Sequence, residues 1–104
     1  MSFVVELSPA AVVDLERLFD FLPDRGKTTE DLDRAQAAID AIRAAAQNHL
    51  ASTPFSFRKA AHNPAQRELI IPFAGTGYVA LYEIVSPSKV VVLAVRHQRE
   101  EDYH

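Results

Sequence analysis

The pattern of apolar and polar positions at the start of the chain predicts a short strand followed by a helix. Polar and apolar residues alternate weakly over residues 2–7. Ser8 and Pro9 follow, and they suit the cap and the first turn of a helix. Apolar side chains then recur at helical spacing at Ala11, Val12, Leu15, Leu18, Phe19 and Leu22. The opposite, solvated face of this helix is predicted to carry Asp14, Glu16, Arg17 and Asp20.

A second helix is predicted from Thr28 or Thr29 to about Leu50. Thr28 with Asp31 three residues later makes an approximate capping box, and the segment 23–26, Pro-Asp-Arg-Gly, separates this helix from the first. Its apolar stripe consists of Leu32, Ala35, Ile39, Ile42 and Ala46. The short break between the two helices predicts that they are antiparallel neighbours.

The periodicity is lost between Ser52 and Ala65, and strand patterns follow. Three strands are predicted, at residues 67–73, 78–85 and 89–95. They are separated by the hairpin-length turns 75–77 and 86–88. The last strand is apolar on both faces, which predicts a position in the interior of the sheet.

The order strand, helix, helix, strand, strand, strand is typical of an α+β domain. We predict an antiparallel helical hairpin packed on one face of a mainly antiparallel sheet of about four strands, with the first strand parallel to a neighbour. The 104 residues are expected to form one domain over residues 1–104. The other face of the sheet is expected to stay open unless a partner covers it.

The composition of the chain excludes several functional classes. The chain has no cysteine, which excludes disulfides and thiol chemistry. No apolar run approaches the ~18–20 residues that span a bilayer, and the N-terminus lacks the features of a signal peptide, so we expect a cytoplasmic protein without a membrane partner. Net charge is −3, yet residues 41–67 carry four basic and no acidic side chains. Such a distribution favours a local anionic contact over a surface that grips nucleic acid throughout.

Ionisable side chains gather where the last predicted strand ends. Histidine titrates near neutral pH, so His97 suits proton transfer, although a structural histidine bonded to a backbone carbonyl is the favoured interpretation. Arg67, Arg96 and Arg99 would form an anion site if they converged, because guanidinium groups match phosphates and carboxylates. Ion pairs with nearby acids explain them equally well; those acids are Glu68, Glu100, Glu101 and Asp102.

Other candidate residues have competing interpretations. Tyr78 and Tyr82 share one face of a strand, where packing is favoured over base stacking. Tyr103 is either a docked anchor or part of a frayed end. A secondary basic loop, which suits either phosphate contact or solvation, contains Arg58, Lys59 and His62. The four histidines show no metal-ligand spacing, and no phosphate-binding loop precedes a helix, so no metal or cofactor is expected.

Several short motifs recur in this element order. They are Ala11 followed by Asp14-Leu15, Leu50 with Pro54, Arg67-Glu68-Leu69, the segment from Tyr78 to Tyr82, and Val95-Arg96-His97-Gln98-Arg99. Together they resemble the RelE/ParE superfamily of bacterial type II toxins. The last motif is similar to the ending of the ParE and plasmid-stabilisation branch.

The resemblance implies a toxin that a cognate antitoxin neutralises. One branch of the superfamily cleaves messenger RNA in the ribosome, and the ParE-like branch inhibits DNA gyrase. Val79 stands where the ribonuclease branch often has an arginine, and the second predicted strand lacks that branch's lysines. We therefore predict a ParE-like gyrase inhibitor whose target-binding surface comprises Arg67, Tyr82, Arg96, His97, Arg99 and Tyr103.

Two alternatives remain open at this point. A ribonuclease would use His97 as the general acid or base, together with Arg67, Arg99 and Tyr103. An inactive interaction module of the same fold is the other alternative. The partners expected are an antitoxin and either gyrase or the ribosome with its messenger RNA, and a homodimer would follow if an apolar face stayed uncovered.

Overall fold

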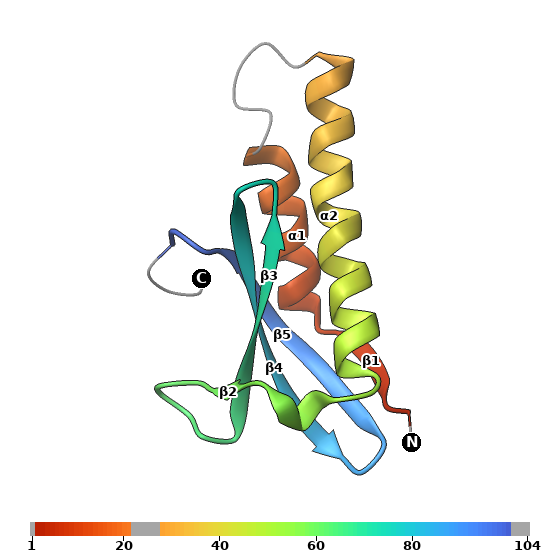
Figure 1. Ribbon diagram of the computed structural model, residues 1–104, viewed down its shortest axis with the longest axis vertical. Coiled ribbons are helices and arrows are strands. Elements are labelled where there is room, and N and C mark those ends of the chain that lie inside the picture. The colour runs from red at the N-terminus through yellow and green to blue at the C-terminus, as the bar shows by residue number, and fades with distance from the viewer. Residues whose placement is uncertain (1, 22–27, 101–104) are drawn as a thin grey trace.

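The computed structural model describes residues 2–21 and 28–100 (Figure 1). The helices are α1 (Pro9–Phe21) and α2 (Thr29–Leu50), followed by a short 3₁₀ helix at Pro54–Ser56. The strands are β1 (Val4–Leu7), β2 (Arg58–Lys59), β3 (Gln66–Phe73), β4 (Thr76–Ser86) and β5 (Lys89–His97). The predicted α+β order of elements is confirmed.

The strands form one sheet in the order β1-β5-β4-β3-β2. β1 runs parallel to β5, and the other neighbours are antiparallel. The sheet therefore has five strands rather than about four, because the two-residue β2 pairs with the start of β3. β5 lies between β1 and β4, as its apolar character on both faces predicted. The two helices lie side by side against one face of this sheet (Figure 1).

The predicted capping box starts α2. The Asp31 amide donates to Thr28 Oγ1 at 3.1 Å, and the Thr28 amide donates to Asp31 Oδ2 at 3.3 Å. The buried face of the helix comprises Ala35, Ala38, Ile39, Ile42, Ala46 and Leu50. Leu32, predicted for this stripe, is 40% exposed, since the first turns of α2 extend beyond the β3–β4 turn (Figure 1).

The core lies between the helices and the sheet. Tyr78 and Tyr82 of β4 are its largest fully buried side chains, which confirms packing as their role. The core is completed from the helices by residues such as Leu15 and Ile42 and from the strands by residues such as Leu69, Val90 and Val92.

The β3–β4 turn lies one residue earlier than predicted. Phe73 pairs with Thr76, so the two turn residues are Ala74 and Gly75, with φ angles of 47° and 79°. Two positive φ angles in a two-residue hairpin define a type I′ turn. Glycine adopts this backbone readily, whereas alanine does so at a cost.

One charged residue of α1 is buried, contrary to prediction. β1 ends at Leu7, but β5 continues along α1, and Asp14 Oδ2 there accepts a hydrogen bond from the Val95 amide at 2.9 Å. Asp14 is consequently only 5% exposed. The hydroxyl of Ser8 likewise donates to the Leu93 carbonyl at 3.0 Å. The side chains of Ser8 and of Asp14 on α1 thus replace a neighbouring strand along this part of β5, because buried backbone groups require partners.

Candidate protein-binding surfaces

Arg67 and Arg96 lie on opposite faces of the sheet, so the predicted convergence of the arginines is wrong for this pair. Arg67 pairs with the buried Tyr82, which places its side chain on the face that the helices cover. There Arg67 Nη1 donates to the Phe57 carbonyl at 2.7 Å. Arg96 pairs with Val79, which is next to Tyr78 along β4. Because successive strand residues point to opposite faces, Val79 and Arg96 lie on the open face.

On the open face, the carboxylate of Glu68 lies between two arginines. Its Oε1 is 2.9 Å from Arg58 Nε, and its Oε2 is 4.0 Å from Arg96 Nη2. The side chains of Glu68 and Arg96 are each 13% exposed, whereas that of Arg58 is 58% exposed. Ion pairing, which was one of the two interpretations of the arginines, is therefore observed for Arg96. The side chain of Arg58 is more exposed than that of Arg96.

The chain beyond β5 is held against α1. Glu100 Oε1 is 2.7 Å from Arg17 Nη1, and Arg96 Nη1 donates to the Glu100 carbonyl at 2.6 Å. These contacts fix the course of the backbone through Arg99, whose side chain is exposed. Tyr103, predicted for this surface, lies outside the described residues.

His97 has a hydrogen-bond partner at each ring nitrogen. Nδ1 accepts from the Arg99 amide at 3.1 Å, and Nε2 lies 2.9 Å from Thr76 Oγ1. Because Nδ1 accepts, the neutral ring carries its proton on Nε2 and donates it to Thr76. The ring also packs edge-on against Tyr78 at 5.4 Å between centroids. This arrangement supports a structural histidine, although its backbone partner is an amide rather than the expected carbonyl.

Tyr82 does not reach the surface. It is fully buried, and its hydroxyl donates to the Pro54 carbonyl at 2.5 Å. Burial raises the pKa of Tyr82 to about 12, an effect that the nearby Arg67 guanidinium partly opposes. The prediction that Tyr82 is part of the target-binding surface is therefore wrong. Tyr82 belongs to the core, because the even-numbered residues of β4 face the helices.

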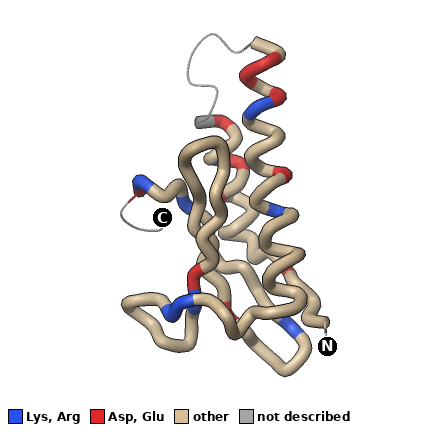
Figure 2. Tube along the Cα trace, in the orientation of Figure 1, with Lys and Arg blue, Asp and Glu red and all other residues tan. Residues whose placement is uncertain are grey.

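The open face of the sheet is largely apolar with charged residues between the apolar ones. On this face β3, β4 and β5 carry Ile70, Val79, Leu81, Val91 and Ala94. Of these, Leu81 and Val91 are half-buried, and Val79 and Ala94 are buried. Ile70 is 40% exposed. Lysine and arginine lie mostly along the strands and their ends, while acidic residues are concentrated on the helices (Figure 2). Lys59 of β2 and His62, which follows β2, are both exposed.

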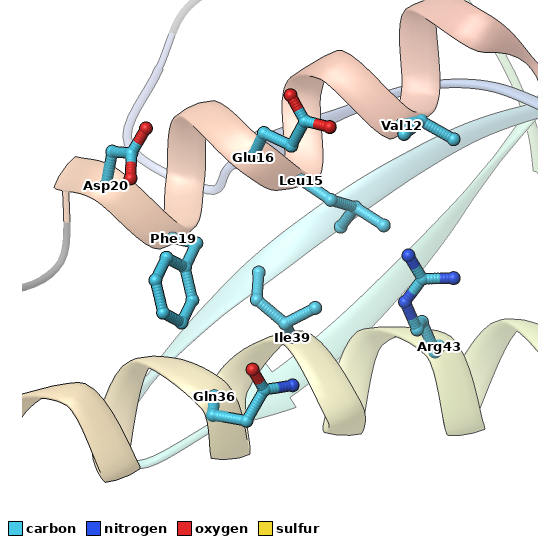
Figure 3. Close-up of a pocket in the computed structure, with 8 residues that line it drawn as sticks. All are labelled: Val12, Leu15, Glu16, Phe19, Asp20, Gln36, Ile39 and Arg43. Carbon is cyan, nitrogen blue, oxygen red and sulfur yellow. The ribbon is translucent and has the colours of Figure 1, made fainter.

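A second candidate surface is an open groove of about 500 Å³ between α1 and α2 (Figure 3). Its apolar lining consists of Val12, Leu15, Phe19 and Ile39, and its polar lining of Glu16, Asp20, Gln36 and Arg43. The sequence does not predict this groove, because Val12 and Phe19 have the spacing of an apolar stripe that faces the core. Only the separation of the two helices leaves these side chains partly exposed.

The described ranges 2–21 and 28–100 lack the features of two other functional classes, metal binding and membrane spanning by a helix. No cluster of three or more histidine and acidic side chains in these ranges is arranged to hold a metal ion. Neither described helix combines the length and apolar character needed to cross a membrane.

Two comparisons with known proteins gave a match, one to a family model and one to a solved structure. A family model described as "ParE toxin of type II toxin-antitoxin system, parDE" matches residues 5–102. No curated protein matches the chain. A solved structure titled "Chromosomal ParDE TA system from P. aeruginosa" matches with a TM-score of 0.72 and 12% sequence identity, covering 92% of this chain and 96% of that chain. At this identity the structural match shows a shared fold alone.

Proposed function

The chain belongs to the ParE toxin family of type II toxin–antitoxin systems, and we propose that it acts in the cytoplasm by binding DNA gyrase, without catalysis of its own. A cognate antitoxin neutralises it. The observation that carries the non-catalytic proposal is the state of His97, whose two ring nitrogens both have hydrogen-bond partners.

RNA cleavage would need a base, an acid and a cation around one phosphate. His97 lies in the same row of the sheet as Tyr78 and Ile71. Arg67 lies four residues away from Ile71 along β3, which separates the two rows by roughly 13 Å. The backbone positions of His97 and Arg67 therefore argue against their meeting at one phosphate.

The open face of the sheet is the surface we assign to the target. It combines the exposed apolar side chain of Ile70 with the exposed guanidinium group of Arg58, which pairs with Glu68 two residues away along β3. Arg99, exposed beyond the end of β5, is the second arginine we assign to this surface. Apolar anchors with arginine at the rim are typical of protein interfaces. Charge at the rim would steer association with an acidic region of the target.

The groove between α1 and α2 is the surface we assign to the antitoxin. Its α1 wall runs from Val12 to Asp20, about 12 Å at 1.5 Å per residue, which matches roughly two turns of a bound helix. Apolar walls suit the apolar side of an amphipathic helix. The acidic rim formed by Glu16 and Asp20 would favour basic residues on that helix.

Two assays on the purified protein test this function. We expect inhibition of gyrase supercoiling and unimpaired translation in a cell-free system, with both unchanged by His97→Gln. Degradation of messenger RNA that this substitution abolishes would refute the proposal. Normal growth of cells that express the chain without its neighbouring gene would instead indicate an inactive interaction module.

The two surfaces are separable by substitution. Arg58→Glu should weaken inhibition of gyrase and leave binding to the product of the neighbouring gene unchanged, whereas Glu16→Lys with Asp20→Lys should do the reverse. Loss of both activities in either variant, with the fold intact by circular dichroism, would contradict the assignment.

A further inference from the structure

β1 forms one edge of the sheet, and its outer side carries backbone groups without partners. The Val4 amide donates to the Ser88 carbonyl before β5 at 2.9 Å, so the even-numbered residues of β1 face β5. Successive residues of a strand direct their backbone groups to opposite sides, so those of Val5 and Leu7 point away from the sheet. In the described part of the chain, these outward groups have no hydrogen-bond partner.

The end of α2 already takes the place of a neighbouring strand at the start of this edge. The Phe3 amide, on the same outer side as Val5, donates to the Ala51 carbonyl at 2.7 Å. Further along β1, an open pocket of about 230 Å³ separates the strand from α2. It is lined by Val5, Leu7, Arg43, Ala46 and Gln47. The edge beyond Phe3 therefore has both the unpaired backbone groups and the space that an added strand requires.

We propose that the outer edge of β1 binds an extended segment of a protein partner as an added antiparallel strand with the pattern apolar–basic–apolar. Antiparallel pairing is slightly more stable per residue than parallel pairing. The two apolar residues pair with Val5 and Leu7, and the basic residue lies opposite Glu6 between them. This third binding surface is independent of gyrase and of toxicity.

The side chains along the edge select this pattern. Val5 pairs with the buried Val90, so Val5 and Leu7 lie on the face of the sheet that α2 covers. Residues opposite them would enter the pocket, where Val5, Leu7 and Ala46 favour apolar side chains. Glu6 lies on the other face, and its side chain is 53% exposed. A basic residue opposite Glu6 is favourable, whereas an acidic one is not.

The charge of Glu6 also disfavours a second copy of this chain as the occupant. Two β1 strands paired antiparallel through Val5 and Leu7 would place Glu6 directly opposite Glu6 of the other copy. Like charges at directly opposed positions destabilise a strand pair. The edge therefore favours a different protein with a base at this position.

A synthetic peptide, Thr-Val-Lys-Val-Thr blocked at both ends, tests this pairing. It is titrated into the full-length protein, and backbone amide shifts are followed by NMR. We expect the largest shifts at the amides of Val5 and Leu7, and binding roughly 2- to 5-fold tighter than that of Thr-Val-Glu-Val-Thr.

Methylation of the peptide's backbone nitrogens separates strand pairing from side-chain contact. Methylation of both valine nitrogens should weaken binding roughly tenfold or more, because antiparallel pairing uses these N–H groups. Methylation of the lysine backbone nitrogen is the matched control, and it should leave binding nearly unchanged, since that N–H points away from β1.

An exchange of charges within the protein tests the choice of a basic residue. Glu6 Oε2 lies 3.0 Å from Lys89 Nζ. Glu6→Lys with Lys89→Glu keeps an ion pair between β1 and β5 but reverses the charge at the edge, so the glutamate peptide should now bind more tightly.

Three results would overturn this assignment. The first is that the lysine peptide leaves the amides of Val5 and Leu7 unchanged. The second is that methylation of the lysine nitrogen weakens binding as much as methylation of the valines. The third is that the charge-exchanged protein still prefers the lysine peptide. The comparison of methylated peptides uses the wild-type protein, so it holds even if the exchanged variant does not fold.

Discussion

Replacement of Asp14 by alanine should destabilise the fold far more than replacement of any other acidic residue on α1. The carboxylate is 5% exposed and accepts from the Val95 amide at 2.9 Å. It also lies 3.9 Å from Arg17 Nε, a buried nitrogen without a hydrogen-bond partner in the described chain. Alanine would leave the Val95 amide unpaired and remove the carboxylate beside Arg17 Nε.

The expected cost follows from that geometry. Loss of a hydrogen bond to a charged acceptor, with a buried donor left unpaired, costs about 3 kcal/mol. For a domain of this size such a loss lowers Tm by roughly 12–24 °C. Asp14→Asn keeps an oxygen acceptor and should lose about half as much. Glu16→Ala is the control, since Glu16 is exposed on the same helix, and it should stay within about 0.5 kcal/mol of the wild type.

Urea unfolding gives the free energies, and amide hydrogen exchange locates the change. In Asp14→Ala the Val95 amide should lose more protection than its neighbours in β5. A cost below about 0.5 kcal/mol, or an equal cost for Glu16→Ala, would show that this hydrogen bond does not replace a strand contact along β5.

Two further predictions concern stability. Folding raises the pKa of Tyr82 from 10.0 to about 12, so Tyr82 ionises at lower pH in the unfolded chain than in the folded protein. The free energy of unfolding should therefore fall as pH rises between these values. Urea titrations at several alkaline pH values should show a smaller fall in Tyr82→Phe. Ala74→Asn should stabilise the protein by about 0.5–1 kcal/mol, since asparagine tolerates the positive φ of a type I′ turn better than alanine. Gly75→Ala should destabilise it at the neighbouring position, and thermal unfolding that reversed this order would contradict the turn assignment.

Local sequence patterns identified the elements and part of the site. The capping box at Thr28 depends on residues three apart, and the proline at the start of α1 acts through its own backbone, so both are visible without tertiary information. The family motifs added the relationship to ParE toxins.

The positions of Arg96 and Asp14 required the folded structure. Residues 90–95 are all apolar, so alternation assigns no face to Arg96, and the register of β5 also shifts where Leu81 and Tyr82 pair with Ala94 and Val92. Asp14 has the spacing of a solvated residue, and only the end of β1 beside α1 exposes a backbone amide that requires it. Sequence determines which groups a segment offers, whereas pairing between distant segments determines which backbone groups lack partners and which side chains meet.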